Sequence, residues 1–132
     1  MKALGHWKIT KNSIKIITDS DFCKFYRWLL IRGTYFTKKF QIPLHGAHIN
    51  IVAEKIHNKD CSDYLYLNGK EIWFQYDVSA NFGGFKTGKF VNYWLDVKCL
   101  EGDEIQRELG IFKKTDEFSN FHITICNSKN LP

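Results

Sequence analysis

The sequence predicts a single domain of mixed α/β (α+β) architecture that spans residues 1–132. Short segments in which apolar and polar residues alternate indicate strands, and two other segments have the spacing and end signals of helices. A chain of 132 residues with 44% hydrophobic content can bury a core of modest size without disulfide or metal cross-links.

The first half of the chain is predicted to contain three strands and one helix. Capping side chains at 18–21 precede the helix, whose apolar residues recur at helical spacing until Gly33, a plausible C-terminal cap. The expected elements, in chain order, are strands at 7–10 and 13–18, a helix at 22–33 and a strand at 48–52.

The second half is predicted to contain four strands and a short helix. Asn68-Gly69 is the strongest short hairpin signal in the chain, and residues 81–89 form a glycine-rich basic loop. The expected elements are strands at 63–67, 70–77, 90–99 and 122–126 and a helix at 103–109. Each half thus has a helix followed by glycine, a loop, and a strand that begins with histidine.

Two five-residue segments repeat one pattern. His48-Ile49-Asn50-Ile51-Val52 and His122-Ile123-Thr124-Ile125-Cys126 both read histidine, isoleucine, small polar, isoleucine, small apolar. Strand side chains alternate between two faces, so the isoleucines would point into a core. Each histidine would share the opposite face with the polar residue two positions later. Two such pairs facing each other would make a small polar site with two-fold character.

Two histidines on separate strands suit metal-free phosphodiester chemistry. A neutral imidazole takes a proton from the attacking hydroxyl, while a protonated one gives a proton to the departing oxygen. The ordinary histidine pKa of about 6.5 allows both states near neutral pH. Asn50 and Thr124 would donate hydrogen bonds to the non-bridging phosphate oxygens. His48, His122, Asn50 and Thr124 are therefore the predicted catalytic residues.

The two motifs, His48-Ile49-Asn50 and His122-Ile123-Thr124, resemble the paired His-x-Thr/Ser motifs of the two-histidine (2H, LigT-like) phosphoesterase superfamily. Its members include RNA 2′-5′ ligase-like and cyclic phosphodiesterases. The resemblance implies a bilobal fold in which two pseudo-symmetric antiparallel sheets line a central cleft, with helices outside. It also implies His48 and His122 as acid and base and Thr124 as a phosphate ligand. Asn50 departs from the usual threonine or serine, because it keeps an N–H donor but changes its reach.

The segment Tyr93-Trp94-Leu95-Asp96-Val97, ahead of a short helix and the second motif, is most similar to small phage anti-CBASS phosphodiesterases. These cleave the cyclic dinucleotide signals of bacterial defence. The resemblance implies a metal-independent, cofactor-free hydrolase that acts on a small cyclic or linear oligonucleotide. Two alternatives stay open: an enzyme acting on 2′,3′-cyclic phosphates or 2′-5′ links at RNA ends, and a non-catalytic nucleotide-binding module.

Four further residues are predicted to bind substrate. Lys86 and Lys89 lie in the glycine-rich loop, which is either a basic lid that attracts phosphates or simply a solvated loop. Trp73 and Trp94 lie on strand faces opposite an apolar stripe, where each could stack a base. Packing of Trp73 against a neighbouring loop is the alternative.

Other functional classes are not favoured. The loop has P-loop spacing, but Phe90 stands where serine or threonine is required, which excludes triphosphate binding. His45 and His48 would lie on opposite faces of a strand, so no metal site is predicted. The net charge of +5 favours an anionic ligand, and no protein partner is evident.

Composition also bears on location. No apolar run approaches the ~20 residues of a membrane span, and the first ten residues lack a signal-peptide pattern. The four cysteines are widely separated, and Cys23, Cys99 and Cys126, which lie in apolar patterns, are expected to be buried free thiols. The sequence therefore predicts a cytoplasmic protein, located in the host cytoplasm if viral, that does not bind membranes.

Overall fold

The computed structural model describes residues 1–33, 40–41, 46–78, 81–84, 90–111 and 121–129. The strands, in chain order, are β1 (Lys2–Ile9), β2 (Ile14–Thr18), β3 (Phe40–Gln41), β4 (His48–Val52), β5 (Glu71–Tyr76), β6 (Asn81–Gly84), β7 (Phe90–Lys98) and β8 (Phe121–Lys129). The helices are α1 (Ser20–Gly33), α2 (Glu54–His57), α3 (Leu100–Glu108) and the 3₁₀ helix η1 (Ser62–Leu67).

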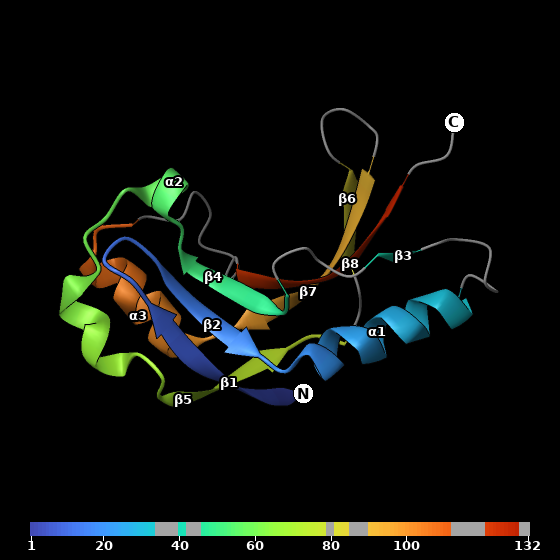
Figure 1. The fold of residues 1–132 in the computed structure, drawn as a ribbon, viewed down its shortest axis with the longest axis horizontal. Helices are drawn as coiled ribbons and strands as arrows, with labels where there is room; N and C mark the ends of the chain where they lie inside the picture. Colours follow the sequence, from blue (N-terminus) through green and yellow to red (C-terminus); the bar gives the residue numbers. More distant parts are fainter. Residues whose placement is uncertain (34–39, 42–45, 79–80, 85–89, 112–120, 130–132) are drawn as a thin grey trace.

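The described strands form one antiparallel sheet with the order β3-β8-β4-β2-β1-β5-β7-β6 (Figure 1). Because β7 pairs with β8 as well as with β5, the sheet closes on itself. The closed ring is β8-β4-β2-β1-β5-β7, and β3 and β6 lie outside it. The fold is therefore mixed α+β, built around an antiparallel barrel.

Alternating burial along the strands creates the core inside the ring. In β2, Ile14 and Ile16 have no exposed surface, whereas Lys15 between them is half-buried. The same alternation makes Ile49 and Ile123 fully buried in β4 and β8. These strands thus turn their isoleucines inward and the polar residues between them outward.

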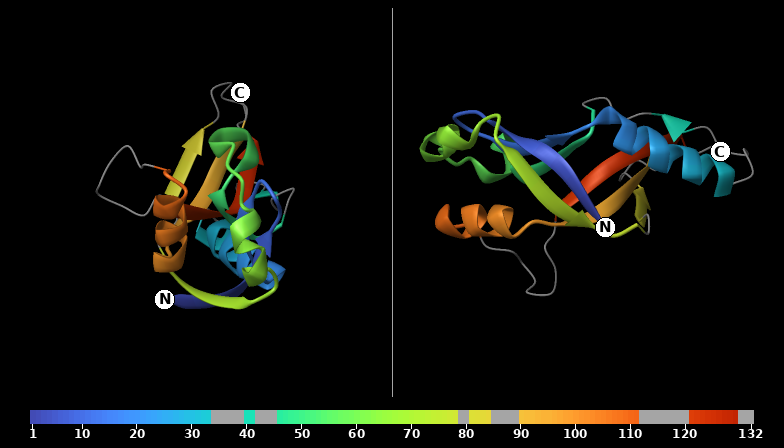
Figure 2. Two further views of the ribbon diagram at one scale, coloured as in Figure 1. Left: turned by 90° about the vertical axis from the view of Figure 1, so that its left-hand side faces the viewer. Right: turned by 90° about the horizontal axis from the view of Figure 1, so that it is seen from below.

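Two helices pack at opposite ends of the molecule (Figure 2). At one end, the Cys23 thiol of α1 donates to the Thr124 carbonyl oxygen of β8 at 3.4 Å. At the other end, the Gln106 amide of α3 donates to the Ile51 carbonyl oxygen of β4 at 2.9 Å. The helices therefore contact the two strands that carry the histidine motifs. No described helix is long and apolar enough to cross a membrane.

The two longer helices, α1 and α3, and most strands occur where the sequence predicts them, but 63–67 is the 3₁₀ helix η1 rather than a strand. Cys61 and Tyr64 are buried and Leu67 is half-buried, a spacing of three residues that matches the 3₁₀ period. Asn68-Gly69 therefore joins η1 to β5 and is not a hairpin turn between strands. Its Asn68 side-chain oxygen accepts from the Ile9 amide at 2.8 Å, and Gly69 has a φ of +84°.

The second half differs from expectation in one more place. Asn81–Gly84, expected within a loop, forms strand β6 and pairs with β7.

The expectation of two separate sheets lining a cleft is not confirmed, since the described strands belong to one sheet. Cys23, Cys99 and Cys126 are buried free thiols, as predicted, and so is Cys61.

Candidate functional site

The two histidine strands are neighbours in the sheet. Ile49 of β4 pairs with Ile123 of β8 in antiparallel register, and both side chains point into the core. Residues one position away on each strand then face one another on the outer surface of the barrel. The pairing has local two-fold character, centred between the two isoleucines.

This register brings together the four predicted catalytic residues. Extending it by one residue in each direction places His48 opposite Thr124 and Asn50 opposite His122. The two histidines are therefore diagonal neighbours on one face, roughly 7–8 Å apart at their Cα atoms. Asn50 and His122 are exposed, whereas His48 and Thr124 are half-buried.

A backbone carbonyl orients the His48 ring. Its Nδ1 lies 3.0 Å from the Gly46 carbonyl oxygen. A carbonyl oxygen can only accept, so Nδ1 carries the hydrogen, and the lone pair of the neutral ring is on Nε2. Gly46 has a φ of +74°, a backbone conformation that favours glycine. The turn before β4 thus prepares the Nε2 atom of His48 to accept a proton.

Strand β7 adds two side chains beside the second histidine. In the β7–β8 register, Asp96 lies opposite His122 and Trp94 lies opposite Thr124. The Trp94 and His122 ring centroids are 6.2 Å apart, with an interplanar angle of 61°. The structure therefore brings Trp94 to the site, as predicted, and adds Asp96. Because Trp94 and Asp96 are two residues apart, strand alternation alone places them on one face of β7. Only the β7–β8 register shows that this face lies beside His122.

Strand β2 adds a lysine on the other side. Lys15 lies opposite Asn50, and Lys8 of β1 lies opposite Lys15. Like charges directly opposite one another in a sheet repel, so an anion near this pair would be stabilising. In the described residues neither amine takes part in a salt bridge. Sequence reasoning missed Lys15, because its relation to Asn50 depends on which strand lies beside β4.

The remaining predicted substrate-binding residues are not brought to this site. Trp73 lies on the outer face of β5, separated from β4 by β1 and β2 in one direction and by β7 and β8 in the other. Lys86 and Lys89 lie outside the described residues. The hollow of about 260 Å³ that the structure contains lies beside Trp73, and neither histidine lines it.

Thiol and metal chemistry find little support in the described residues. Burial raises the pKa of Cys23 and of Cys99 to about 11 and that of Cys126 to about 12, so these thiols are protonated near neutral pH. Within the described ranges, no group of three or more histidine, cysteine, aspartate or glutamate side chains is arranged to hold a metal ion. The two imidazoles of the site have neutral neighbours (Asn50, Thr124 and Trp94), one cationic neighbour (Lys15) and one anionic neighbour (Asp96).

Comparisons of this chain with protein-family models, with curated protein sequences and with solved structures gave no match.

Proposed function

We propose that the protein is a metal-independent phosphodiesterase of the two-histidine type that cleaves small oligonucleotides. The main support is the pairing of Ile49 with Ile123, which sets His48 and His122 diagonally on one solvent-facing surface. When a phosphodiester lies between two imidazoles at this separation, one imidazole can take the proton of the attacking hydroxyl while the other gives a proton to the leaving oxygen. The repeated sequence motif and the common surface on which both histidines lie are two separate observations, and both support a two-histidine site.

In this proposal His48 is the base and His122 is the acid. His48 Nε2 takes the proton of a ribose hydroxyl adjacent to the phosphodiester, and the hydroxyl oxygen then bonds to phosphorus. The bond from phosphorus to the leaving oxygen breaks, and His122 gives that oxygen its proton. The products are a cyclic phosphate and a free hydroxyl. The Gly46 contact supports the assignment of His48, and the neighbouring Asp96 carboxylate attracts an imidazolium at His122.

The neighbouring residues would stabilise the charge on phosphate. Asn50 and Thr124 can donate hydrogen bonds to the non-bridging oxygens, where negative charge increases in the transition state. The Lys15 amine, on the other side of Asn50, would attract the anionic substrate before the reaction. Trp94 is positioned to stack a base next to the scissile phosphate.

We further propose that the substrate is a cyclic dinucleotide, as in the phage anti-CBASS enzymes of the two-histidine superfamily. The bilobal architecture of that superfamily is proposed for this chain on the same basis. RNA-end 2′,3′-cyclic or 2′-5′ phosphodiester bonds are the alternative substrates. A second candidate function is a non-catalytic nucleotide-binding module in the cytoplasm. Asn50 in place of the usual hydroxyl residue favours it.

A mixing experiment tests these proposals. The protein is incubated with cyclic dinucleotides, linear 2′-5′ oligoadenylate and RNA bearing 2′,3′-cyclic ends, with and without EDTA. We expect turnover of one class that EDTA does not change, and a loss of at least about 10²-fold in His48→Ala and in His122→Ala. His6→Ala, an exposed histidine on β1, is the matched control. Near-full activity of either catalytic variant would disprove the mechanism, and binding without turnover would favour the module.

A further inference from the structure

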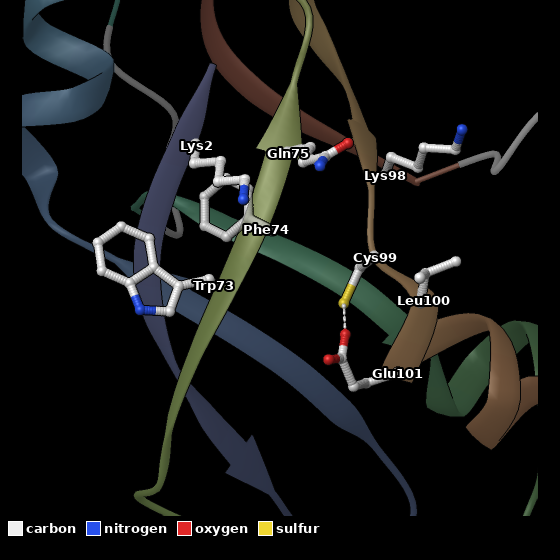
Figure 3. A pocket seen from close by; sticks show the side chains of 8 residues that line it. All are labelled: Lys2, Trp73, Phe74, Gln75, Lys98, Cys99, Leu100 and Glu101. Atoms are coloured by element: carbon white, nitrogen blue, oxygen red, sulfur yellow. Dashed lines mark hydrogen bonds between the residues drawn. The ribbon is translucent and has the colours of Figure 1, made fainter.

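A hollow of about 260 Å³, which neither histidine lines, opens between β5, the end of β7 and the start of α3 (Figure 3). It exists because β5 and β7 pair only at Gln75–Lys98 and Tyr76–Val97, after which β7 ends and the chain enters α3. The side chains that matter for its chemistry are Lys2, Trp73, Phe74, Gln75, Lys98 and Glu101.

One cross-strand row supplies positive charge at the hollow. Lys2 of β1 lies opposite Gln75, and Gln75 lies opposite Lys98 of β7. An amide is thus flanked by two amines, and in the described part of the chain neither amine is in a salt bridge. Glu101 contributes one negative charge and accepts a hydrogen bond from the Cys99 thiol at 3.7 Å. The lining therefore has a net charge of +1, which favours a small anion.

An aromatic surface lies beside this row. Trp73 is 61% exposed, whereas its neighbour Phe74 is 1% exposed and forms part of the buried core. Trp73 and Gln75 are two residues apart on β5 and therefore share the outer face. Lys2 lies opposite Gln75 in the β1–β5 register, so its side chain is on the same face of the sheet as the Trp73 indole. An exposed indole beside an amine and an amide can contact a planar ring and its charged substituent together.

We propose that this hollow binds a nucleotide, with the base stacked on Trp73 and the phosphate held by the Lys2 amine and the Gln75 amide. Lys98 adds attraction for the anion from the other side of Gln75. The volume of about 260 Å³ is slightly below the range of roughly 300–1,000 Å³ for small-molecule pockets, so part of a bound nucleotide would lie outside the hollow, against the exposed indole. The site can be tested apart from the proposed catalysis because neither histidine lines the hollow, although β7, which carries Lys98, also pairs with the His122 strand β8.

Calorimetric titration of AMP tests the site, carried out in the His48→Ala/His122→Ala double variant so that the catalytic pair does not contribute. We expect one AMP per chain and at least about fivefold weaker binding of adenosine and of inorganic phosphate. Trp73→Ala should weaken AMP binding at least about fivefold, as expected for the loss of base stacking, and Trp73→Phe should retain most of the affinity. Lys2→Gln should weaken binding of AMP but not of adenosine.

Two exposed residues outside the hollow provide matched controls, Trp28→Ala on α1 and Lys55→Gln on α2, which should leave AMP affinity unchanged. The proposal is overturned if millimolar AMP does not bind, if Trp73→Ala has no effect, or if inorganic phosphate binds as tightly as AMP. Failure of the wild-type protein to cleave oligonucleotides would remove the proposed catalytic function and leave this site unaffected.

Discussion

At the residue scale, Asn50 decides whether the histidine site is complete for catalysis. It is exposed on β4, with Lys15 of β2 on one side and His122 of β8 on the other. Its amide reaches about one bond farther than a threonine hydroxyl. An amide N–H between a cation and an imidazole is well placed to bind a phosphate oxygen.

If this amide stabilises the charge that develops on phosphate, Asn50→Ala should lower kcat by about 10²–10³, the usual loss for one transition-state donor. Asn50→Thr should recover part of the loss, since a β-branched hydroxyl residue also suits a strand. Single-turnover rates at saturating substrate are the appropriate measurement. A kcat within a few-fold of wild type in Asn50→Ala would show that Asn50 only fills space.

The pH profile tests the two histidines together. Because one must be neutral and the other protonated, kcat/KM should follow a bell-shaped curve that reports two apparent pKa values of the pair. The profile should be measured in single turnover between about pH 5 and 9, which brackets the ordinary histidine range. A flat profile would contradict acid–base catalysis by the pair.

The sequence identifies the four residues of the two histidine motifs but not the residues that lie beside them on neighbouring strands. Strand alternation is sufficient to place His48 with Asn50 and His122 with Thr124 on solvent-facing surfaces. The neighbours Asp96 and Lys15 depend on which strands pair and in what register, and these long-range pairings are not encoded in a local pattern. Trp73 shows the converse, because an exposed aromatic on a strand does not reveal which side of the barrel that strand occupies.

At the element scale, local periodicity predicts most of the strands and both longer helices, and it fails where two periods resemble one another. The 3₁₀ helix η1 was expected as a strand because its apolar and polar residues partly alternate. The closing contact between β7 and β8 joins strands that the sequence separates by α3 and further residues. Tertiary pairing, rather than any local signal, therefore determines that one sheet forms.

Close approach of β1 to β2 gives an element-scale prediction. A Cβ at Gly5 would lie 2.6 Å from Ile16 Cγ2 and 2.8 Å from the Ile17 carbonyl oxygen. The backbone oxygen cannot move without disturbing the β1–β2 pairing, so Gly5→Ala should lower the free energy of unfolding by about 1–3 kcal/mol.

Urea unfolding measures the effect of Gly5→Ala, and Gly33→Ala is the control. No atom lies within 4 Å of a Cβ at Gly33, the last residue of α1. The control should be neutral or stabilised by up to about 1 kcal/mol, because alanine has the higher helix propensity. Equal stabilities for the two variants would mean that the β1–β2 contact is looser than described.

At the scale of the whole molecule, buried thiols couple stability to alkaline pH. Burial raises the pKa of Cys23 and Cys99 from 9.0 to about 11 and that of Cys126 to about 12. These side chains are at most 2% exposed. The pKa of Tyr64 rises to about 12, first through burial and then through its hydrogen bond to Glu108. The folded protein therefore retains protons that the unfolded chain releases.

The sign of the effect follows from proton binding. Between about pH 9 and 11 the unfolded chain binds fewer protons than the folded protein, so the free energy of unfolding falls as pH rises. Each of the three thiols can lower the free energy of unfolding by up to about 1.4 kcal/mol for each pH unit in this range. Urea unfolding under reducing conditions at pH 7.5, 9 and 10 should show constant stability below pH 9 and a steep loss above it. Cys23→Ala should reduce that slope by about one thiol's share, while constant stability up to pH 10 in the wild type would mean that the thiols ionise in the folded protein.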